Sequence, residues 1–553
     1  MPDPMPVSAA APPADRWLRG PRLALLIALV AVAWFATIGY RDLADPDEGR
    51  YSEISREMVA TGDWVTPRLD GLKYFEKPPL QYWATAVSFT LLGPSDFAAR
   101  AYTGLAGLLS VLAVAFCAGR LWGRRAGVTT GGVALGMFGI VALANVVTLD
   151  MGVAFWLTLS LCGFLLALRA GDPDSRRRWM LVVWAAMAGA VLSKGLIGVV
   201  IPGTVLLLHV LSTRNWRLLA QLEWLRGLPL FLLIAAPWFV LVSMRNPEFA
   251  HFFFVHEHFE RFLTTEHHRE GAPWYFVPIL LGGLLPWLSL APAAVRDGWR
   301  DPSGRVLVLW CSFVFVFFSI SKSKLPGYLS PIFPAMAMLI GRSLAAETLR
   351  LARHATGLMA GALMVGIAAA IVLPQLGDAR TPPEVFRAAT PFAVLAMALL
   401  AGAAWLARRL EGCGQHLASV IVLGAGALSM SDALDAGYQD FAALRCDRQA
   451  AALIEATVPG APVFAVDYYN QTLPFYLRRT VTLVRFSGEF ELGQRAEPER
   501  WIPDFATFAA RWAQLPAAAA VTRPETWDKH LQRLGLSARV LYRDGRRVVL
   551  VKP

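Results

Sequence analysis

The stretch that decides the fold of this chain is RDLADPDEGRYSEISREMVATGDWVTPRLDGLKYFEKPP, residues 41–79. It is densely charged, although strongly apolar segments lie on both sides of it. A charged side chain without a partner is costly in the hydrocarbon of a bilayer. We therefore expect residues 41–79 to form a loop in water at a membrane face, and we expect this loop to carry the active site.

The first part of the loop has the pattern of a short helix. Asp45 is predicted to be its N-cap, Pro46 suits the first helical position, and Glu48 would complete a capping box. Apolar side chains then recur at helical spacing, at Tyr51, Ile54 and Met58. The pattern predicts an amphipathic helix that lies on the bilayer surface.

Asp47 falls in the first turn of this predicted helix, and Arg50 lies on the same face one turn later. A carboxylate at this position has two interpretations. It either complements the positive end of the helix dipole or acts in catalysis. The pattern alone leaves both open.

The composition indicates a membrane protein with many helices. Of the 553 residues, 56% are apolar and only 17% are charged. Apolar runs of nearly twenty residues recur from residue 23 to about residue 432. The net charge of +11 comes largely from arginines in short loops, which is the pattern of cytoplasmic loops and gives no reason to expect a nucleic-acid partner.

The charge pattern also predicts the topology. Residues 1–22 are expected to be a cytoplasmic tail, and residues 41–79 the first periplasmic loop. Residues 80–93 are too short to span the bilayer and end at Gly93-Pro94, so they are predicted to be a juxtamembrane helix. About thirteen spans are expected in the transmembrane domain, residues 23–432: 23–39, 98–118, 128–148, 151–169, 179–194, 196–212, 228–244, 274–292, 305–320, 326–340, 356–373, 388–406 and 416–432.

Residues 433–553 differ in composition and are predicted to be a periplasmic α/β domain. Strands are expected at residues 462–467, 479–484 and 517–522. Residues 538–551 have the pattern of a hairpin with Asp544-Gly545 at its turn. We find no catalytic motif in this domain, which favours a capping or assembly role.

Several basic residues break the charge pattern because they fall on the predicted outer side. They are Lys73, Lys77, Lys194, Arg245, Arg261, Arg269, Lys322 and Lys324. Such cations either form ion pairs with acids such as Asp47 and Asp150 or bind lipid phosphates. Two or three of them, converging from separate loops, could form a pocket for an anionic lipid.

Asp150 lies where one predicted span ends and the next begins, with almost no loop between them. A carboxylate at that depth needs a polar cavity or a partner. It is therefore either the structural partner of a pocket lysine or a second acid of the active site.

The periplasmic loop at residues 245–273 is rich in histidine. If this loop meets residues 41–79, His258 and Glu76 could together hold a divalent cation, zinc or magnesium. The alternative is an ordinary surface histidine with a hydrogen bond. The chain contains no CxxC, HExxH or GxSxG motif and no glycine-rich nucleotide loop, which argues against a nucleotide-driven pump.

Taken together, DPDEGRYSEISREMVATGDWVTPRLDGLKYFEKPPLQYW, LDM, SKG, EHFERF and SKSKLPGY resemble the conserved blocks of GT-C glycosyltransferases. These membrane enzymes take a sugar from a polyprenyl phosphate. Among them the chain most resembles the bacterial 4-amino-4-deoxy-L-arabinose lipid A transferases. The resemblance covers most of the first 340 residues. It implies an all-α, polytopic GT-C fold with about thirteen transmembrane helices and an outer C-terminal domain.

The resemblance also implies roles for single residues. Asp47 matches the catalytic aspartate, and Asp150 matches a second acidic position. Glu76 and His258 match positions that bind a metal. Gly49 stands where several relatives have threonine, a change expected to loosen the helix locally. The site for the carrier-lipid phosphate is expected to comprise Lys77, Arg50, Arg261, Lys322, Lys324 and Tyr328.

The function implied is inverting transfer of aminoarabinose from undecaprenyl phosphate to lipid A phosphates, which gives resistance to cationic peptides such as polymyxin. The implied location is the bacterial inner membrane among membrane lipids, as a monomer, with a cytoplasmic N-terminus and a periplasmic active site and C-terminus. Two alternatives remain. One is a GT-C transferase that glycosylates protein hydroxyls or another glycan. The other is a transporter of lipid-linked sugars, although the internal repeat typical of transporters is not evident.

Overall fold

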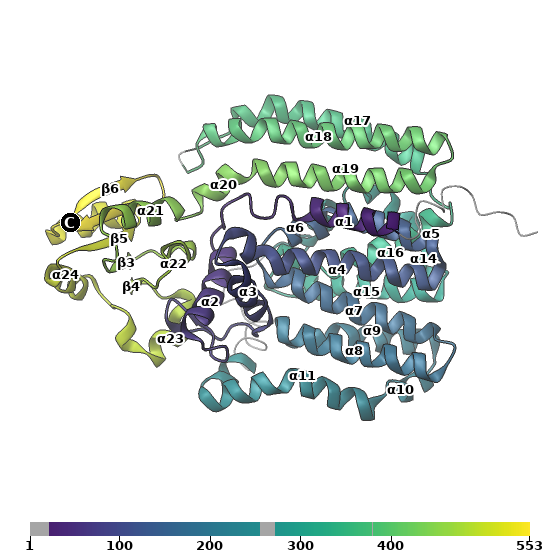
Figure 1. The fold of residues 1–553 in the computed structure, drawn as a ribbon, viewed down its shortest axis with the longest axis horizontal. Helices are drawn as coiled ribbons and strands as arrows, with labels where there is room; N and C mark the ends of the chain where they lie inside the picture. The colour runs from purple at the N-terminus through teal and green to yellow at the C-terminus, as the bar shows by residue number, and fades with distance from the viewer. Residues whose placement is uncertain (1–20, 255–270, 379, 553) are drawn as a thin grey trace, which may run out of the picture.

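The computed structural model describes residues 21–254, 271–378 and 380–552. Long helices lie side by side in a bundle, and a small domain with a β-sheet lies at one end of it (Figure 1). Two shorter helices, α2 (Asp47–Thr61) and α3 (Leu80–Leu92), lie between the bundle and the sheet domain. The mostly helical architecture with a C-terminal α/β domain is the predicted fold class.

Each expected span coincides with a helix or a pair of neighbouring helical segments. The elements are α1 (Pro21–Phe35), α4 (Asp96–Trp122), α5 (Arg124–Leu135), α6 (Phe138–Ala144), α7 (Leu149–Arg169), α8 (Pro173–Lys194), α9 (Ile197–Thr213), α10 (Arg217–Ala220), α11 (Trp224–Arg245), α13 (Phe276–Gly283), η3 (Leu288–Leu290), α14 (Ala291–Trp299), α15 (Pro302–Ile320), η4 (Pro326–Leu329), α16 (Ile332–Ala345), α17 (Leu351–Val372), η5 (Leu373–Gln375), α18 (Pro383–Gly412) and α19 (His416–Gly437).

Among the described residues, seven helices are long and apolar enough to cross a membrane. The number rises to nine if two bent pairs, α5 with α6 and α13 with the η3–α14 segment, each count as one span. The pairs bend by 58° and 103°. The helices are those of a multi-pass membrane protein, and the count of thirteen crossings stays a prediction.

Glycines allow close packing between helices of the bundle. A Cβ atom on Gly424 of α19 would lie 2.1 Å from the backbone oxygen of Gly132 in α5. A Cβ on Gly341 of α16 would lie 2.4 Å from the hydroxyl of Thr130 in α5. Because helices in lipid gain little from burying apolar surface, such close backbone packing contributes much of their association.

The helix α2 differs from its prediction in two ways. The residue before it is Pro46, which makes no side-chain capping bond, and Asp45 accepts a hydrogen bond from the backbone N–H of Gln471 (2.8 Å) instead. The predicted capping box is therefore wrong. The exposed polar face expected of an amphipathic helix is also wrong, because polar side chains of α2 are buried along with its apolar ones. These buried polar residues are Glu48, Arg50, Ser52, Glu53, Ser55 and Glu57.

The helix α3 has 13 residues and follows the short strands β1 (Arg68–Leu69) and β2 (Leu72–Lys73). Its length of about 20 Å is less than the roughly 30 Å of a bilayer's hydrocarbon core. It is not among the candidate spans of the described chain. A juxtamembrane position for residues 80–93 remains the prediction that fits these facts.

The C-terminal domain is an α/β domain, as predicted. Its sheet has the order β4-β3-β5-β7-β6, with β3, β4 and β5 parallel and β6 and β7 in an antiparallel hairpin. Asp544 holds the turn of that hairpin by accepting backbone N–H bonds from Arg546 and Arg547. The elements are α20 (Gln439–Leu444), α21 (Arg448–Thr457), β3 (Val463–Val466), α22 (Thr472–Leu477), β4 (Thr482–Val484), η6 (Gly488–Phe490), α23 (Glu491–Ala496), η7 (Pro498–Arg500), α24 (Phe505–Gln514), β5 (Ala518–Thr522), α25 (Pro524–Lys529), η8 (Leu531–Leu534), β6 (Arg539–Arg543) and β7 (Val548–Lys552).

Candidate active site

Asp47 is the first residue of α2, and its side chain is 39% exposed. Its carboxylate lies 3.5 Å from the guanidinium of Arg50, which is buried and also contacts Glu489 of the sheet domain (3.2 Å). Burial alone would lower the pKa of Arg50, but the acidic groups of Tyr74 and Glu489 hold it well above its ordinary value. Arg50 therefore stays charged, and Asp47 keeps a face that a ligand can reach.

The neighbouring acid, Glu48, is buried and serves as an anchor. Its carboxylate accepts hydrogen bonds from Arg100 of α4 (2.8 Å) and from the backbone N–H of Val147 (3.1 Å). It also forms an ion pair with Arg41. Burial tends to raise the pKa of Glu48, but Arg100 and Arg41 hold it below its usual range.

Glu48 thereby joins the start of α2 to α4 and to the connection between α6 and α7. Asp47 is its neighbour in sequence, and Asp150 follows Val147 by three residues. The sequence interpretation missed this role because it assigned Glu48 to a capping box. One signal was available: Arg100 is a charge inside a predicted span, and such a charge usually has a partner.

Glu76 and Lys77 lie in the connection between β2 and α3. The Lys77 ammonium donates to the backbone oxygen of Glu76 (2.7 Å) and lies 3.9 Å from its carboxylate. Both side chains are largely buried, with 17% of Lys77 and 14% of Glu76 exposed. Burial raises the pKa of Tyr51 well above its ordinary value, and the charges of Asp47 and Glu76 add to that increase. Tyr51 is therefore close enough to both acids for their charges to affect its hydroxyl.

A second group forms where α7, α8 and the SKSKLPGY segment meet. Asp150, in the first turn of α7, forms an ion pair with Lys194 at the end of α8. The Lys194 ammonium lies 4.7 Å from the centre of the Tyr328 ring. A Cβ atom on Gly327 would lie 2.3 Å from the Asp150 carboxylate, so only glycine allows this approach. Asp150 is thus the partner of a lysine, one of its two predicted roles.

The lysines of the SKSKLPGY segment differ from each other. Lys324 is buried, and its ammonium donates to the backbone oxygens of Ser321 (2.6 Å) and Ser319 (3.2 Å). Lys322 is exposed. A Cβ on Gly271 would lie 3.0 Å from the Lys324 side chain, so the end of the histidine-rich loop reaches this lysine.

Two predicted site residues, Arg261 and His258, lie outside the residues that the structure describes. The Glu76–His258 metal pair and the contribution of Arg261 therefore stay predictions. Within the described parts of the chain, no three His, Cys, Asp or Glu side chains are placed to hold a metal ion together.

Two cations of the outer loops have structural partners. Lys73 forms an ion pair with Glu248 (2.8 Å), and Arg245 forms one with Asp63 (3.4 Å). These pairs join residues 41–79 to the beginning of the loop at 245–273, as the sequence analysis assumed when it paired Glu76 with His258.

The sheet domain closes over the start of α2. A Cβ on Gly49 would lie 2.5 Å from the backbone of Gln471, the residue before α22. A larger side chain at position 49 would therefore push α22 away from α2. Gln471 also contacts Glu489, the partner of Arg50. No site residue of this domain was predicted from the sequence, because these contacts join positions more than 400 residues apart.

The arrangement combines a reachable carboxylate with several cations. Asp47 with Arg50, and Asp150 with Lys194, each pair an acid with a base. Lys77 and Lys324 have ammonium groups that contact backbone oxygens. The cations of such a set can bind a phosphate, and a carboxylate can contact another group of the substrate that reacts.

Two family models match the chain. The dolichyl-phosphate-mannose-protein mannosyltransferase model matches residues 22–253, and the aminoarabinose transferase C-terminal domain model matches residues 449–552. The first segment contains Asp47, Lys77, Asp150 and Lys194, and the second contains most of the sheet domain.

Curated relatives agree with these matches. The undecaprenyl phosphate-alpha-4-amino-4-deoxy-L-arabinose arabinosyl transferase of Aeromonas salmonicida is 38% identical over 312 residues, 55% of this chain and 56% of the relative. The protein of the same description from Edwardsiella ictaluri is 36% identical over 323 residues, 57% of this chain and 58% of the relative. The matched segment thus spans a little over half the length of these relatives.

Solved structures extend the match to nearly the whole chain. The crystal structure of ArnT from Cupriavidus metallidurans bound to undecaprenyl phosphate superposes with a TM-score of 0.91 at 36% identity, covering 96% of this chain and 97% of that one. The oligosaccharyltransferase of Archaeoglobus fulgidus has a TM-score of 0.50 at 11% identity, covering 91% of this chain and 69% of that one. The second likeness concerns the fold alone.

Proposed function

Because the chain belongs to the aminoarabinose transferase family of GT-C proteins, we propose that it transfers 4-amino-4-deoxy-L-arabinose from undecaprenyl phosphate to lipid A phosphate groups. The observation that carries this proposal is the match to an ArnT crystal structure bound to undecaprenyl phosphate, at 36% identity over 97% of that chain. The candidate site supports it, because Arg50 in α2 and Lys77 just before α3 belong to the segment between the bundle and the sheet domain (Figure 1).

The donor phosphate would bind to cations from separate segments. Lys77 precedes α3, Lys324 and Tyr328 belong to the SKSKLPGY segment, and Arg50 comes from α2. We place Lys322 and Arg261 in the same phosphate site by the match to the family motif. Cations help here because negative charge develops on the leaving phosphate as the sugar departs.

In the proposed reaction, a lipid A phosphate oxygen attacks the anomeric carbon of the sugar. The bond from that carbon to the undecaprenyl phosphate oxygen breaks, and its electron pair leaves with the phosphate. The transition state resembles an oxocarbenium ion, as in other glycosyl transfers. Attack from the opposite face inverts the configuration at this carbon.

In this proposal Asp47 acts on the sugar or on the acceptor. An acceptor phosphate is already an anionic nucleophile, so Asp47 would orient the donor's amino group by charge and hydrogen bonding. Asp150 and Lys194 neutralise each other and would fix the wall that carries Tyr328. Adding an amino sugar lowers the negative charge of lipid A, which would weaken the binding of cationic peptides such as polymyxin.

The test of this function uses membranes that contain the protein and undecaprenyl phosphate carrying labelled aminoarabinose. We expect the label to move to the lipid A fraction. Label in the protein fraction would instead indicate a transferase that acts on protein hydroxyls. Label that changes membrane side while it remains on its carrier would indicate a transporter.

A variant at Lys77 tests the carrier-phosphate site. A hydrogen bond to a charged group contributes about 1.5–3 kcal/mol, so Lys77→Ala should reduce donor use roughly ten- to a hundredfold. Lys77→Arg should restore part of it, because the charge remains while the shape differs. Lys73→Ala is the matched control, since Lys73 pairs with Glu248. Unchanged binding of undecaprenyl phosphate by Lys77→Ala would remove this lysine from the site.

A further inference from the structure

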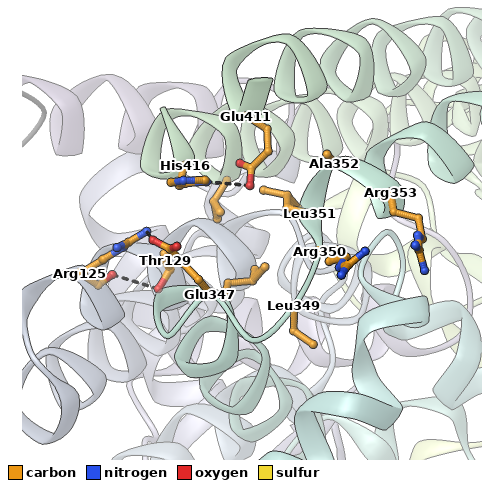
Figure 2. A pocket seen from close by; sticks show the side chains of 12 residues that line it. Arg125, Thr129, Glu347, Leu349, Arg350, Leu351, Ala352, Arg353, Glu411 and His416 are labelled. Atoms are coloured by element: carbon orange, nitrogen blue, oxygen red, sulfur yellow. Dashed lines mark hydrogen bonds and ion pairs between the residues drawn. The ribbon is translucent and has the colours of Figure 1, made fainter. Parts of the chain in front are cut away.

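A cavity of about 400 Å³ lies at the end of the bundle opposite the sheet domain. The beginnings of α5, α17 and α19 and the ends of α16 and α18 meet around it (Figures 1 and 2). None of the residues proposed for sugar transfer lines it. The cavity is therefore separate from the candidate active site.

The cavity carries positive charge without a partner. Its two carboxylates are each paired: Glu347 with Arg125 (2.5 Å), and Glu411 with His416 (2.7 Å). Two further arginines of the lining, at positions 350 and 353, are exposed and have no ion pair within the described chain. Figure 2 shows these two arginines on one side of the cavity and the paired residues on the other.

The helix beginnings add to this charge. The helices α5, α17 and α19 contain 12, 22 and 22 residues, and none has a side-chain capping bond at its N-terminus. The first backbone N–H groups of a helix lack partners within it, and the helix dipole makes that end positive. The beginning of α17 lies beside the two arginines without an ion pair in the described chain, because Arg350 precedes this helix and Arg353 is in its first turn. An anion is the ligand that this combination favours.

We propose that this cavity binds a phosphate-bearing ligand, the headgroup of an anionic phospholipid. The helices beside it support a lipid source. In the most apolar windows of α17 and α18, only 11% and 22% of residues are buried, so both helices present apolar side chains outward. Leu349 and Leu351 line the cavity itself. A headgroup on the arginine side can therefore extend its acyl chains along α17 and α18.

The anion would sit beside Arg350 and Arg353 rather than at the opposite wall. One carboxylate oxygen of Glu411 is buried there without a hydrogen-bond partner, and it would repel a phosphate. Because the anion would contact Arg350 and Arg353, substitution of these two arginines tests the site. The matched control is Arg408 with Arg409, since both lie near the end of α18 and neither lines the cavity.

The experiment measures binding of phosphatidylglycerol to the purified full-length protein by native mass spectrometry, with phosphatidylcholine as the neutral lipid. We expect Arg350→Gln with Arg353→Gln to weaken phosphatidylglycerol binding about tenfold or more. Arg408→Gln with Arg409→Gln should leave it close to that of the parent. Both double variants should elute from gel filtration as the parent does, because all four residues lie at the surface or helix end.

Inorganic phosphate distinguishes the two sources of the ligand. One outcome is that inorganic phosphate binds the parent in a manner that depends on Arg350 and Arg353 while phosphatidylglycerol does not bind. That result would keep the phosphate site and reject the lipid headgroup as its ligand. Equal phosphatidylglycerol affinity in both double variants would overturn the site and leave only diffuse surface charge. Sugar transfer should continue in both variants, so failure of this proposal and failure of the transferase function are separate outcomes.

Discussion

At the scale of single residues, two adjacent acids at the start of α2 have different roles. Asp47 is partly exposed and lies 3.5 Å from Arg50, whereas Glu48 is buried among Arg41, Arg100 and backbone N–H groups. A buried carboxylate with this many donors is costly to remove, because its partners would remain buried without it. We therefore infer a positioning role for Glu48, whereas the chemical role of Asp47 stays a prediction.

Asp45 gives a prediction about pH. Burial raises the pKa of Asp45 to about 6 from an ordinary value of 3.8, Asp447 adds to this, and Gln471, Arg50 and Arg445 oppose it. Because the folded pKa is the higher one, the stability that the protonated acid contributes is complete below pH 3.8. It is lost as the pH rises through about 6.

Asp45→Asn removes this dependence, because asparagine is neutral and its oxygen can still accept the bond from Gln471. We expect parent and variant to unfold at similar temperatures near pH 4. Above pH 6 the variant should be more stable, by roughly 1–3 kcal/mol. Thermal unfolding at both pH values measures this. A difference that stays constant across the range would show that Asp45 does not titrate as described.

Residue positions were more predictable than residue partners. Asp47, Glu76 and Lys77 belong to one charged stretch of sequence, which the pattern alone singled out as the candidate site. Besides the nearby backbone N–H of Ala44, Glu48 has partners 7, 52 and 99 residues away, and no local period records such separations. The roles of Asp47, Asp150 and the phosphate-binding cations remain predictions.

At the scale of elements, the helix periods were sufficient to locate the bundle. Each expected span coincides with a helix or a pair of helical segments, and the predicted strands and hairpin turn of the C-terminal domain are present. The failure was α2. Its apolar period at Tyr51, Ile54 and Met58 was identified correctly, but that face packs inside the protein. A sequence period specifies an apolar face without saying whether lipid or protein covers it.

The position of α3 gives a prediction at this scale. In a variant without the five native cysteines, single cysteines at Thr90 and Leu91 should react with a membrane-impermeant maleimide added from the periplasmic side only. Both positions are exposed in the structure, whereas Gln81 is buried and serves as the unreactive control. Reaction at Leu91 from the cytoplasmic side would show that residues 80–93 cross the membrane.

At the scale of the whole molecule, the sheet domain caps the loop of residues 41–79. Glu489 contacts Arg50, Glu497 contacts Arg68, and the backbone N–H of Val481 donates to Asp70. The domain therefore lies at the same end of the bundle as α2 and α3 (Figure 1). This arrangement favours the capping role over assembly and is why we expect the C-terminus and the active site on the same side of the membrane.

The central claim is that Asp47 and its neighbours transfer a sugar from a polyprenyl phosphate. The direct measurement uses the purified protein with undecaprenyl phosphate-aminoarabinose and lipid A, and mass spectrometry of both products. We predict equal amounts of free undecaprenyl phosphate and of modified lipid A. Asp47→Asn should lower both by at least about a hundredfold while it still elutes as the parent does. Release of undecaprenyl phosphate without modified lipid A, or an Asp47→Asn variant with most of the parent's activity, would contradict the account.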